Sequence, residues 1–387
     1  MRAGAGISLS VVLLAVVAAL LSYRGFQSNV EPAMPALNPV ADALGDAAGT
    51  EGYARAVETT AFEFPQDHGA HPAFRNEWWY FTGNLKTADG RRFGYQLTFF
   101  RIALAPRAVD SGSSWRTNQM YMAHFALSDF DRAEHRGFER FGRGAAGLAG
   151  ADNPPLRVWL DHWTLEAEDI SGFPVRLRAE EEGVAIDLLL NAEKPIVLHG
   201  DQGLSRKGGG EGNASYYPTM TRLGTSGTVT TGGERLVVNG ISWLDREWST
   251  SALAPDQAGW DWFAIQFDDG RDLMFYRMRK EDGTPDPASA GTLVAPDGTV
   301  RHLTAAEMDF EVVGEWTSPE SGVGYPTRWR LKLPSEGLTV DIAPVFDAQE
   351  MEVSVRYWEG AIVVRGHDGG GPVAGRGYME LAGYADG

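Results

Sequence analysis

Short apolar and aromatic runs alternate with turn residues from about residue 61 to the end of the chain. In "QMYMAHFALSDF" (119–130), every second residue from Tyr121 to Leu127 falls on one face, which predicts a β-strand. The segments "TADGRR", "FDDGRD", "APDGTV" and "EDGTPD" all contain Asp-Gly, a strong hairpin signal. Long segments with helical period are nearly absent. The pattern therefore predicts an all-β chain whose short strands close into sandwiches or barrels.

A weak internal repeat divides these strands into two sets. "NEWWYFTGNLKTADGRRFGYQLTFFR" (76–101) and "GWDWFAIQFDDGRDLMFYRMR" (259–279) share one order: an acidic residue, Trp, an apolar strand, an Asp-Gly turn, and an aromatic strand ending in Arg. The second copy is about four residues shorter between its Trp and its turn. We expect two similar antiparallel barrels, an N-terminal domain at 61–235 and a C-terminal domain at 236–387.

The N-terminus carries a different pattern. "ISLSVVLLAVVAALL" (7–21) is an apolar run between Arg2 and Arg24. It has the length of a secretory signal core and is short for a spanning helix. We expect residues 1–24 to be a signal peptide, with an uncleaved anchor in the inner membrane as the alternative. Residues 25–60 resemble a linker with one short helix near 41–48. Both interpretations place the rest of the chain in the periplasm or outside the cell.

Charge and composition exclude several function classes. The 387 residues carry a net charge of -18, and no run of five basic residues occurs, so a nucleic-acid partner is not expected. The absence of cysteine removes disulfides, thiolate nucleophiles and zinc–thiolate sites. No serine-hydrolase elbow, phosphate loop or dinucleotide fingerprint is present. We expect no metal and no cofactor.

Carboxylates recur beside aromatic residues. Glu77 opens "EWWYF", Asp245 and Glu247 lie in "SWLDREWS", and Asp261 lies in "GWDWF". Three interpretations stay open for these sites. The tryptophans fill cores while the acids pair with arginines such as Arg246 or accept indole N–H bonds. Alternatively, the aromatics line an apolar cavity. In the third, a desolvated acid stays neutral and donates a proton.

The opening strand shows why the alternatives matter. Trp78 and Tyr80 share one face, and Trp79 and Phe81 share the other. Glu77 falls on the Trp79 face. That face can look into a cavity or into a domain interface. In the first case Glu77 can have a functional role, and in the second it is a structural hydrogen-bond acceptor.

Several of these strings together resemble the AttH/CrtC family, which joins secreted AttH-type proteins with carotenoid 1,2-hydratases (hydroxyneurosporene synthases). They run from "NEWWYFTGNL" and "MAHFALSD" through "NASYY" and "ISWLDREWS" to "YWEGAIVVRG" and "GRGYMELAGY". The resemblance implies two tandem lipocalin-like (calycin-type) antiparallel β-barrels and a hydrophobic ligand. Its hydratase branch adds water to a terminal C=C bond without a cofactor. Its AttH branch is exported and linked with ABC-type export permeases.

The export segment favours the AttH branch. We therefore expect an exported protein that binds a lipid or isoprenoid-type molecule, alongside an ABC transporter permease. The residues expected to contact that ligand are Trp78, Tyr80, Tyr216, Tyr217, Trp248, Trp260, Asp261 and Trp262.

The alternative is a carotenoid 1,2-hydratase, in which an acid protonates the alkene and water captures the cation. Asp245 or Glu247 is then the acid, and Glu77 holds the water. Trp78, Trp248 and Trp262 face the cation, and His124 or Tyr216 tunes proton transfer. Arg246 opposes this assignment, because pairing with either neighbour would lower the pKa of that acid. A secreted hydrolase is a third alternative, for which no nucleophile signature is found.

Overall fold

The computed structural model describes residues 49–107, 113–251 and 253–385. The expected export segment, the short helix near 41–48 and most of the linker lie outside these ranges. Within them, no helix is long and apolar enough to cross a membrane. Short 3-10 helices occur at η1 (Gln66–His68), η2 (Ala305–Glu307) and η3 (Pro334–Glu336). All other regular elements described are strands, so the all-β prediction is confirmed.

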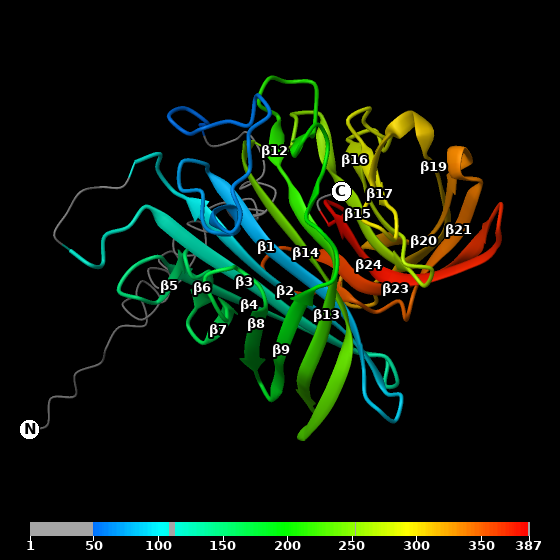
Figure 1. The fold of residues 1–387 in the computed structure, drawn as a ribbon, viewed down its shortest axis with the longest axis horizontal. Coiled ribbons are helices and arrows are strands. Elements are labelled where there is room, and N and C mark those ends of the chain that lie inside the picture. The colour runs from blue at the N-terminus through cyan, green and yellow to red at the C-terminus, as the bar shows by residue number, and fades with distance from the viewer. Residues whose placement is uncertain (1–48, 108–112, 252, 386–387) are drawn as a thin grey trace, which may run out of the picture. The chain divides into compact units, whose positions relative to one another are not determined.

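The first sheet has 14 antiparallel strands in the order β4-β3-β2-β1-β14-β13-β9-β8-β7-β6-β5, with β10, β11 and β12 attached beside β13 and β14 (Figure 1). Its strands are β1 (Asn76–Lys86), β2 (Arg92–Ala103), β3 (Gln119–Asp129), β4 (Glu134–Arg143), β5 (Ala149–Asp152), β6 (Arg157–Leu160), β7 (Trp163–Ala167), β8 (Val175–Glu181), β9 (Val184–Ala192), β10 (Val197–Leu198), β11 (Leu204–Arg206), β12 (Ala214–Tyr216), β13 (Pro218–Thr231) and β14 (Glu234–Ser251).

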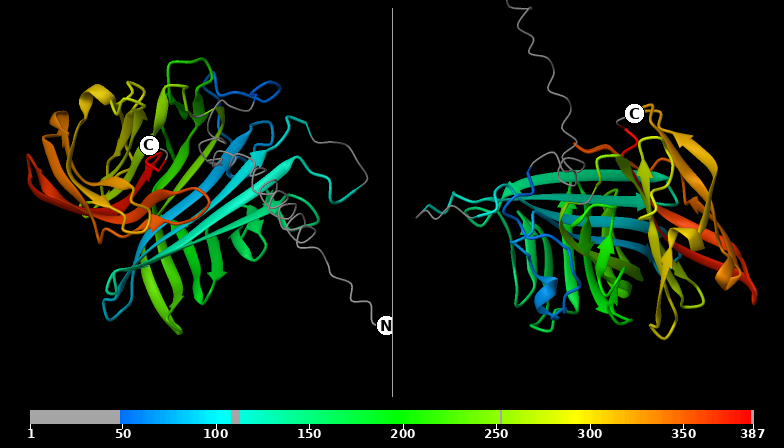
Figure 2. Two further views of the ribbon diagram at one scale, coloured as in Figure 1. Left: turned by 180° about the vertical axis from the view of Figure 1, so that it is seen from behind. Right: turned by 90° about the horizontal axis from the view of Figure 1, so that it is seen from above.

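The second sheet has 10 antiparallel strands in the order β18-β17-β16-β15-β24-β23-β21-β20-β19, with β22 beside β23. Its strands are β15 (Gln257–Phe267), β16 (Asp272–Lys280), β17 (Ala290–Val294), β18 (Val300–Thr304), β19 (Asp309–Thr317), β20 (Gly324–Leu333), β21 (Leu338–Pro344), β22 (Glu350–Met351), β23 (Tyr357–Asp368) and β24 (Gly371–Ala382). Both sheets curl, one nearly closed and the other a half-barrel, as the two views of Figure 2 show.

The two sheets repeat one topology. In each, a four-stranded meander leads the chain, and the last strand returns to pair with the first: β14 with β1, and β24 with β15. The repeat read from the sequence is therefore present in the strand order. The expected boundary at residue 236 needs correction, because β14 continues the first sheet to Ser251 and the second sheet begins at Gln257. Residues 235 and 236 lie near the start of β14, inside the hairpin that β13 and β14 form.

Each sheet encloses its own core, and a third cluster lies between them. Trp79 and Phe81 point into the core of the first sheet, whereas Trp329 and Trp358 belong to that of the second. The third cluster, here called the intersheet cluster, takes buried aromatic and apolar side chains from both sheets: Tyr80, Tyr217, Trp243, Leu253, Trp262, Ala264, Met274, Tyr276, Met278, Ala361 and Tyr378. The Trp79 face of β1 thus looks into a barrel, and the Tyr80 face looks at the other sheet.

Asp272 also holds the sheets together from the start of β16. Its carboxylate accepts bonds from Lys194 at 2.7 Å, Arg222 at 2.7 Å and Thr221 at 2.9 Å, all from the first-sheet side. Asp272 is fully buried, so these three donors replace the water it has lost. The two sheets are joined by polar anchors as well as by apolar packing.

Candidate functional site

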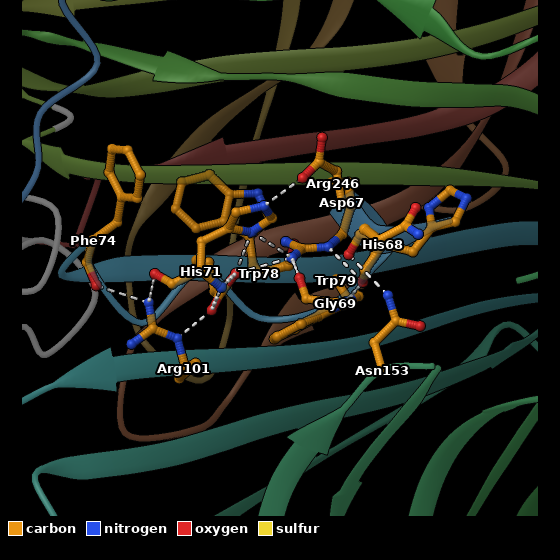
Figure 3. Close-up of polar contacts among 12 residues, drawn as sticks. Asp67, His68, Gly69, His71, Phe74, Trp78, Trp79, Arg101, Asn153 and Arg246 are labelled. Carbon is orange, nitrogen blue, oxygen red and sulfur yellow. Dashed lines mark hydrogen bonds and ion pairs between the residues drawn. The ribbon is translucent and has the colours of Figure 1, made fainter. Parts of the chain in front are cut away.

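Glu77 lies buried near the start of β1 and pairs with two arginines, Arg101 and Arg246, which are labelled in Figure 3. Arg101, its cross-strand neighbour on β2, pairs with one carboxylate oxygen, and Arg246 on β14 pairs with the other at 2.8 Å. The backbone N–H of His71 lies 3.0 Å from both oxygens. Burial would raise the pKa of Glu77, but the two guanidinium groups outweigh it and hold the pKa well below its usual range. Glu77 is ionised, which fits the structural interpretation of this acid.

The same group of residues holds the segment around η1 against the first sheet. The indole N–H of Trp79 donates to the carbonyl of His68 at 2.8 Å, and the Arg246 guanidinium lies 4.0 Å from the Trp79 ring. Figure 3 shows His68 and His71 of this segment beside Arg246. The His71 ring stacks at 3.7 Å on Trp248, a residue expected to contact ligand.

Arg246 pairs with Glu77 and not with either of its neighbours Asp245 and Glu247. Adjacent residues on a strand point to opposite faces, so Arg246 faces Glu77 while Asp245 and Glu247 face the other way. The objection that Arg246 would lower the pKa of those two acids by pairing with them is therefore removed.

Asp245 is buried at the junction of the two sheets, where its carboxylate accepts three hydrogen bonds. Thr219 donates at 2.6 Å, the Trp243 indole donates at 2.7 Å, and the Tyr217 hydroxyl donates to the second oxygen. Burial raises the pKa of Asp245 to about 6 although these donors oppose the shift, and nearby Glu247 raises it further. Asp245 can therefore change its protonation state near neutral pH.

Three of the expected ligand contacts lie around Asp245. The Trp262 indole donates to the Tyr217 hydroxyl at 3.0 Å, and the Tyr80 ring meets the Trp262 ring edge-on at 5.1 Å. The structure thus brings Tyr80, Tyr217 and Trp262 together around the predicted acid. These contacts come from strands of both sheets.

Glu247, the other candidate acid, is a paired anion. Lys207 lies 3.0 Å from its carboxylate, and the Ser215 hydroxyl also donates to it. The Lys207 ammonium group lies over the rings of Tyr276 at 4.0 Å and Tyr217 at 4.6 Å. The Lys207 ammonium group thus gives Glu247 a buried counter-charge.

Two further carboxyl groups face the intersheet cluster, the fully buried Glu359 and the partly buried Glu380, and neither was among the predicted site residues. Burial raises the pKa of Glu380 to about 7, and burial together with Glu380 raises that of Glu359 well above its ordinary value. The Tyr80 hydroxyl donates to Glu359 at 2.7 Å, and the Trp260 indole donates to Glu380 at 2.9 Å. The second carboxyl oxygen of Glu359 has no hydrogen-bond partner. The two sheets therefore enclose carboxylic acids that stay neutral at mildly acidic pH.

A pocket of about 890 Å³ opens beside this region. The loop at 199–210 of the first-sheet side forms one wall, and β16, β17 and β18 with the loops before β15 and β17 form the other. It is called the intersheet pocket here. Its lining mixes apolar and polar side chains, among them Leu204, Met274, Leu303, Tyr276, Thr292 and His199. Drug-sized ligands bind in clefts of this size and character.

A chain of hydrogen bonds leads from the pocket to Asp245. His199 lines the pocket and is buried, and its Nε2 lies 2.9 Å from the Thr219 hydroxyl that donates to Asp245. Its Nδ1 lies 2.8 Å from the hydroxyl of Thr292. On the other side of Thr292, His302 Nδ1 lies 3.4 Å away. The predicted acid is thus connected to the pocket without lining it.

His124 and Tyr216 lie elsewhere. His124 Nδ1 contacts the Tyr357 hydroxyl at 2.8 Å and its Nε2 contacts Glu139 at 3.1 Å, in a separate intersheet contact. The Tyr216 hydroxyl donates to the carbonyl of Glu58 at 2.8 Å. Neither side chain reaches the intersheet pocket.

The remaining expected contacts are structural in this arrangement. Trp78 packs against the intersheet cluster, and Trp260 holds Glu380. Asp261 pairs with Arg277 at 3.0 Å and Arg279 at 3.2 Å. None of these residues lines the intersheet pocket.

No motif in the sequence marks the pocket. His199, Thr219 and Thr292 lie in ordinary strand-and-turn surroundings, and nothing in the chain marks them as partners. Residues 208–210, in a glycine-rich run, also line the pocket. In the part of the chain described, no group of three or more His, Asp or Glu residues is placed to hold a metal ion.

Comparison with known proteins gives consistent matches. A family model described as AttH-like matches residues 55–384. The crystal structure of an AttH protein from Nitrosomonas europaea is 36% identical, covers 86% of this chain and 99% of its own, and superposes with a TM-score of 0.77. Kievitone hydratase from Nectria haematococca is 17% identical, covers 86% of this chain and 98% of its own, and gives a TM-score of 0.65. No curated protein matches the chain.

Proposed function

The chain belongs to the AttH-like family, and from this premise we propose that it binds an amphiphilic, largely apolar molecule of lipid or isoprenoid type in the intersheet pocket. The single observation that carries the proposal is the pocket itself, about 890 Å³ in volume, with an apolar lining and a few polar groups. Met274 and Leu204 offer apolar contact, while Thr292 and His302 can orient a polar head.

Ligand binding is tested by filling the pocket. Ala288 lines it and is half-buried, so Ala288→Trp places an indole in the cavity without removing a side-chain hydrogen bond. The probe is all-trans-retinol, an isoprenoid alcohol that fluoresces. We expect saturable binding to the wild-type protein and at least a tenfold weaker affinity for Ala288→Trp.

The matched control is Ile170→Trp, which adds the same side chain at a position that is 71% exposed. It should bind retinol as the wild type does. Native mass spectrometry of the purified protein should also show a co-purified lipid that Ala288→Trp lacks. Equal retinol affinity in the two tryptophan variants would contradict binding in this pocket.

A second candidate function is acid-catalysed hydration. It is favoured by Asp245, a buried carboxyl group whose pKa lies near 6 and which is surrounded by Tyr80, Tyr217 and Trp262. One protein of the same fold is named a hydratase. Purified protein mixed with an acyclic carotene, without cofactor, should then form a product heavier by one water, and Asp245→Asn should abolish it. If no product forms while the protein still binds retinol, the hydration proposal is contradicted and the binding proposal remains.

We also propose export and an ABC permease partner, both resting on the N-terminal apolar run at 7–21 and on the family resemblance. A fusion of alkaline phosphatase to the chain should be active, since that enzyme needs an oxidising compartment. Deleting residues 1–24 should remove the activity. Phosphatase activity that survives the deletion would contradict export by this segment.

A further inference from the structure

We propose that His199 and Thr219 carry protons between the intersheet pocket and Asp245, so that a hydroxyl or carbonyl group of the ligand, bound beside Thr292, exchanges a proton with this buried carboxyl group. The inference rests on the proposed binding function and deepens it, because it gives the ligand a polar head of stated chemistry and the pocket an acid–base activity.

The distances form an unbroken path. Thr292 lies 2.8 Å from His199 Nδ1, His199 Nε2 lies 2.9 Å from Thr219, and Thr219 lies 2.6 Å from Asp245. Each separation is short enough for a hydrogen bond. His199 and Thr292 both line the pocket, whereas Thr219 and Asp245 lie behind its wall. The path therefore begins at a place that a ligand can reach.

The direction of the bonds follows from the number of hydrogens. Thr219 has one hydroxyl hydrogen and donates it to Asp245, so its oxygen must accept from His199 Nε2–H. In the neutral ring Nδ1 then has no hydrogen and accepts from the hydroxyl of Thr292. The oxygen of Thr292 is left to accept one more hydrogen, from His302 or from a ligand hydroxyl. All donors along the path point toward Asp245.

The surrounding charges keep this arrangement. Burial and then Lys207 and His302 hold the pKa of His199 well below its ordinary value, so its ring is neutral. The Tyr217 ring lies edge-on to His199 at 4.6 Å. Around Asp245, Glu247 opposes its ionisation, Glu380 interacts with it electrostatically, and the Lys207 ammonium group is the nearby positive charge. Without a ligand, a neutral His199 donates a hydrogen bond to Thr219, and Thr219 donates one to the Asp245 carboxylate, which can accept one proton.

The transfer balances without any co-reactant. A ligand O–H bond breaks and its proton passes to the oxygen of Thr292, whose own proton moves to His199 Nδ1. The Nε2 proton moves to Thr219, and the Thr219 proton forms an O–H bond on Asp245. One negative charge has moved from Asp245 to the ligand oxygen. The reverse sequence protonates a ligand oxyanion or enolate oxygen.

A hydrogen-bond network with a purely structural role would hold the same residues in place. The test therefore needs a measurement that responds to proton position as well as to folding. We would follow the His199 imidazole nitrogens by NMR in the full-length protein labelled with ¹⁵N-histidine. We expect the Nε2–H tautomer and a chemical-shift inflection near pH 6 as Asp245 titrates. The inflection should disappear in Asp245→Asn.

Thr219→Val tests the path itself, because valine has the shape of threonine and lacks the hydroxyl, and Thr219→Ser is the matched control that keeps it. We expect the inflection amplitude to fall at least threefold in Thr219→Val and to remain in Thr219→Ser. An Nδ1–H tautomer, or an unchanged inflection in Thr219→Val, would overturn the proposal.

Retinol separates this proposal from ligand binding. Retinol should shift the midpoint of the His199 inflection in the wild type and in Thr219→Ser, and not in Thr219→Val, although all three bind it. Retinol that binds without moving the midpoint in the wild type would overturn the relay and leave binding intact. The wild type could show a Thr219-dependent inflection and yet fail to bind retinol. That result would overturn the binding proposal and leave the hydrogen-bond path from His199 to Asp245 in place.

Discussion

Asp261 occupies in the second sheet the position that Glu77 occupies in the first. Glu77 lies directly across from Arg101 on the next strand, and Asp261 lies directly across from Arg277. Each acid also pairs with a second buried arginine, Arg246 or Arg279. The weak repeat in the sequence thus corresponds to one buried ion-pair arrangement used twice.

We predict that Glu77→Gln destabilises the protein by about 3–5 kcal/mol, because it leaves Arg101 and Arg246 buried without a counter-charge. Asp261→Asn should also lower the free energy of unfolding. The measurement is urea unfolding at pH 7, followed by tryptophan fluorescence.

The control for this prediction is Asp309→Asn, which removes an exposed ion pair with Lys332 at 3.5 Å. Its effect should stay within about 0.5 kcal/mol. A Glu77→Gln protein as stable as this control would show that the arginines are not held by the carboxylate.

The raised pKa of Glu380 should make the free energy of unfolding depend on pH. Burial raises its pKa from 4.5 to about 7, so the folded chain holds this proton more tightly than the unfolded chain. The stability that protonated Glu380 contributes is fully present below its pKa in the unfolded chain. It is lost as the pH rises through its pKa in the folded chain. Glu380→Gln should therefore gain stability over the wild type between pH 5 and pH 8, on the order of 2–3 kcal/mol.

Unfolding free energies at pH 5 and pH 8 check this prediction. The exposed Glu311→Gln variant removes one acid elsewhere on the second sheet and should follow the wild type at both values. If Glu380→Gln loses as much stability as the wild type over this interval, the buried proton lies on another group.

Tyr80→Phe should raise the pKa of Glu359 further and destabilise the fold by about 1–2 kcal/mol. The Tyr80 hydroxyl donates to one oxygen of Glu359 at 2.7 Å, and the other oxygen has no partner, so this substitution leaves the whole carboxyl group unsatisfied. Thermal unfolding measures the loss. Tyr216→Phe, whose hydroxyl bond to Glu58 is exposed, should change stability by less than about 0.5 kcal/mol.

Lys207→Met should destabilise the fold by about 3 kcal/mol, because Glu247 then remains as a buried charge. Glu247→Gln in the same chain should restore part of that loss, which a double-mutant cycle measures as a coupling energy. Additive effects of the two substitutions would mean that the pair is not coupled in solution.

The all-β architecture and the repeat could be predicted because their signals are local. Alternation along one strand and Asp-Gly at the turns involve residues a few positions apart. The two faces of β1 were also assigned correctly relative to each other. Which face met the other sheet could not be predicted, because alternation separates two faces without saying what covers them.

The same reason limits what could be predicted of the candidate site. Asp245, Tyr217 and Trp262, which the structure brings together, could be singled out because acids and aromatics cluster in the sequence. The neighbour Arg246 misled the assignment, since adjacency in a strand places side chains on opposite faces. His199 and Thr292 are 93 positions apart in the chain, and their contact exists only after the two sheets have docked.

The bond between His199 and Thr292 is where the path to Asp245 crosses from one sheet to the other. The bonds from His199 to Thr219 and from Thr219 to Asp245 lie within the first-sheet side. A displacement of one sheet against the other therefore changes the length of the His199–Thr292 bond and leaves those two bonds intact. The proton path that we propose is thus coupled to the docking of the two sheets at this one bond.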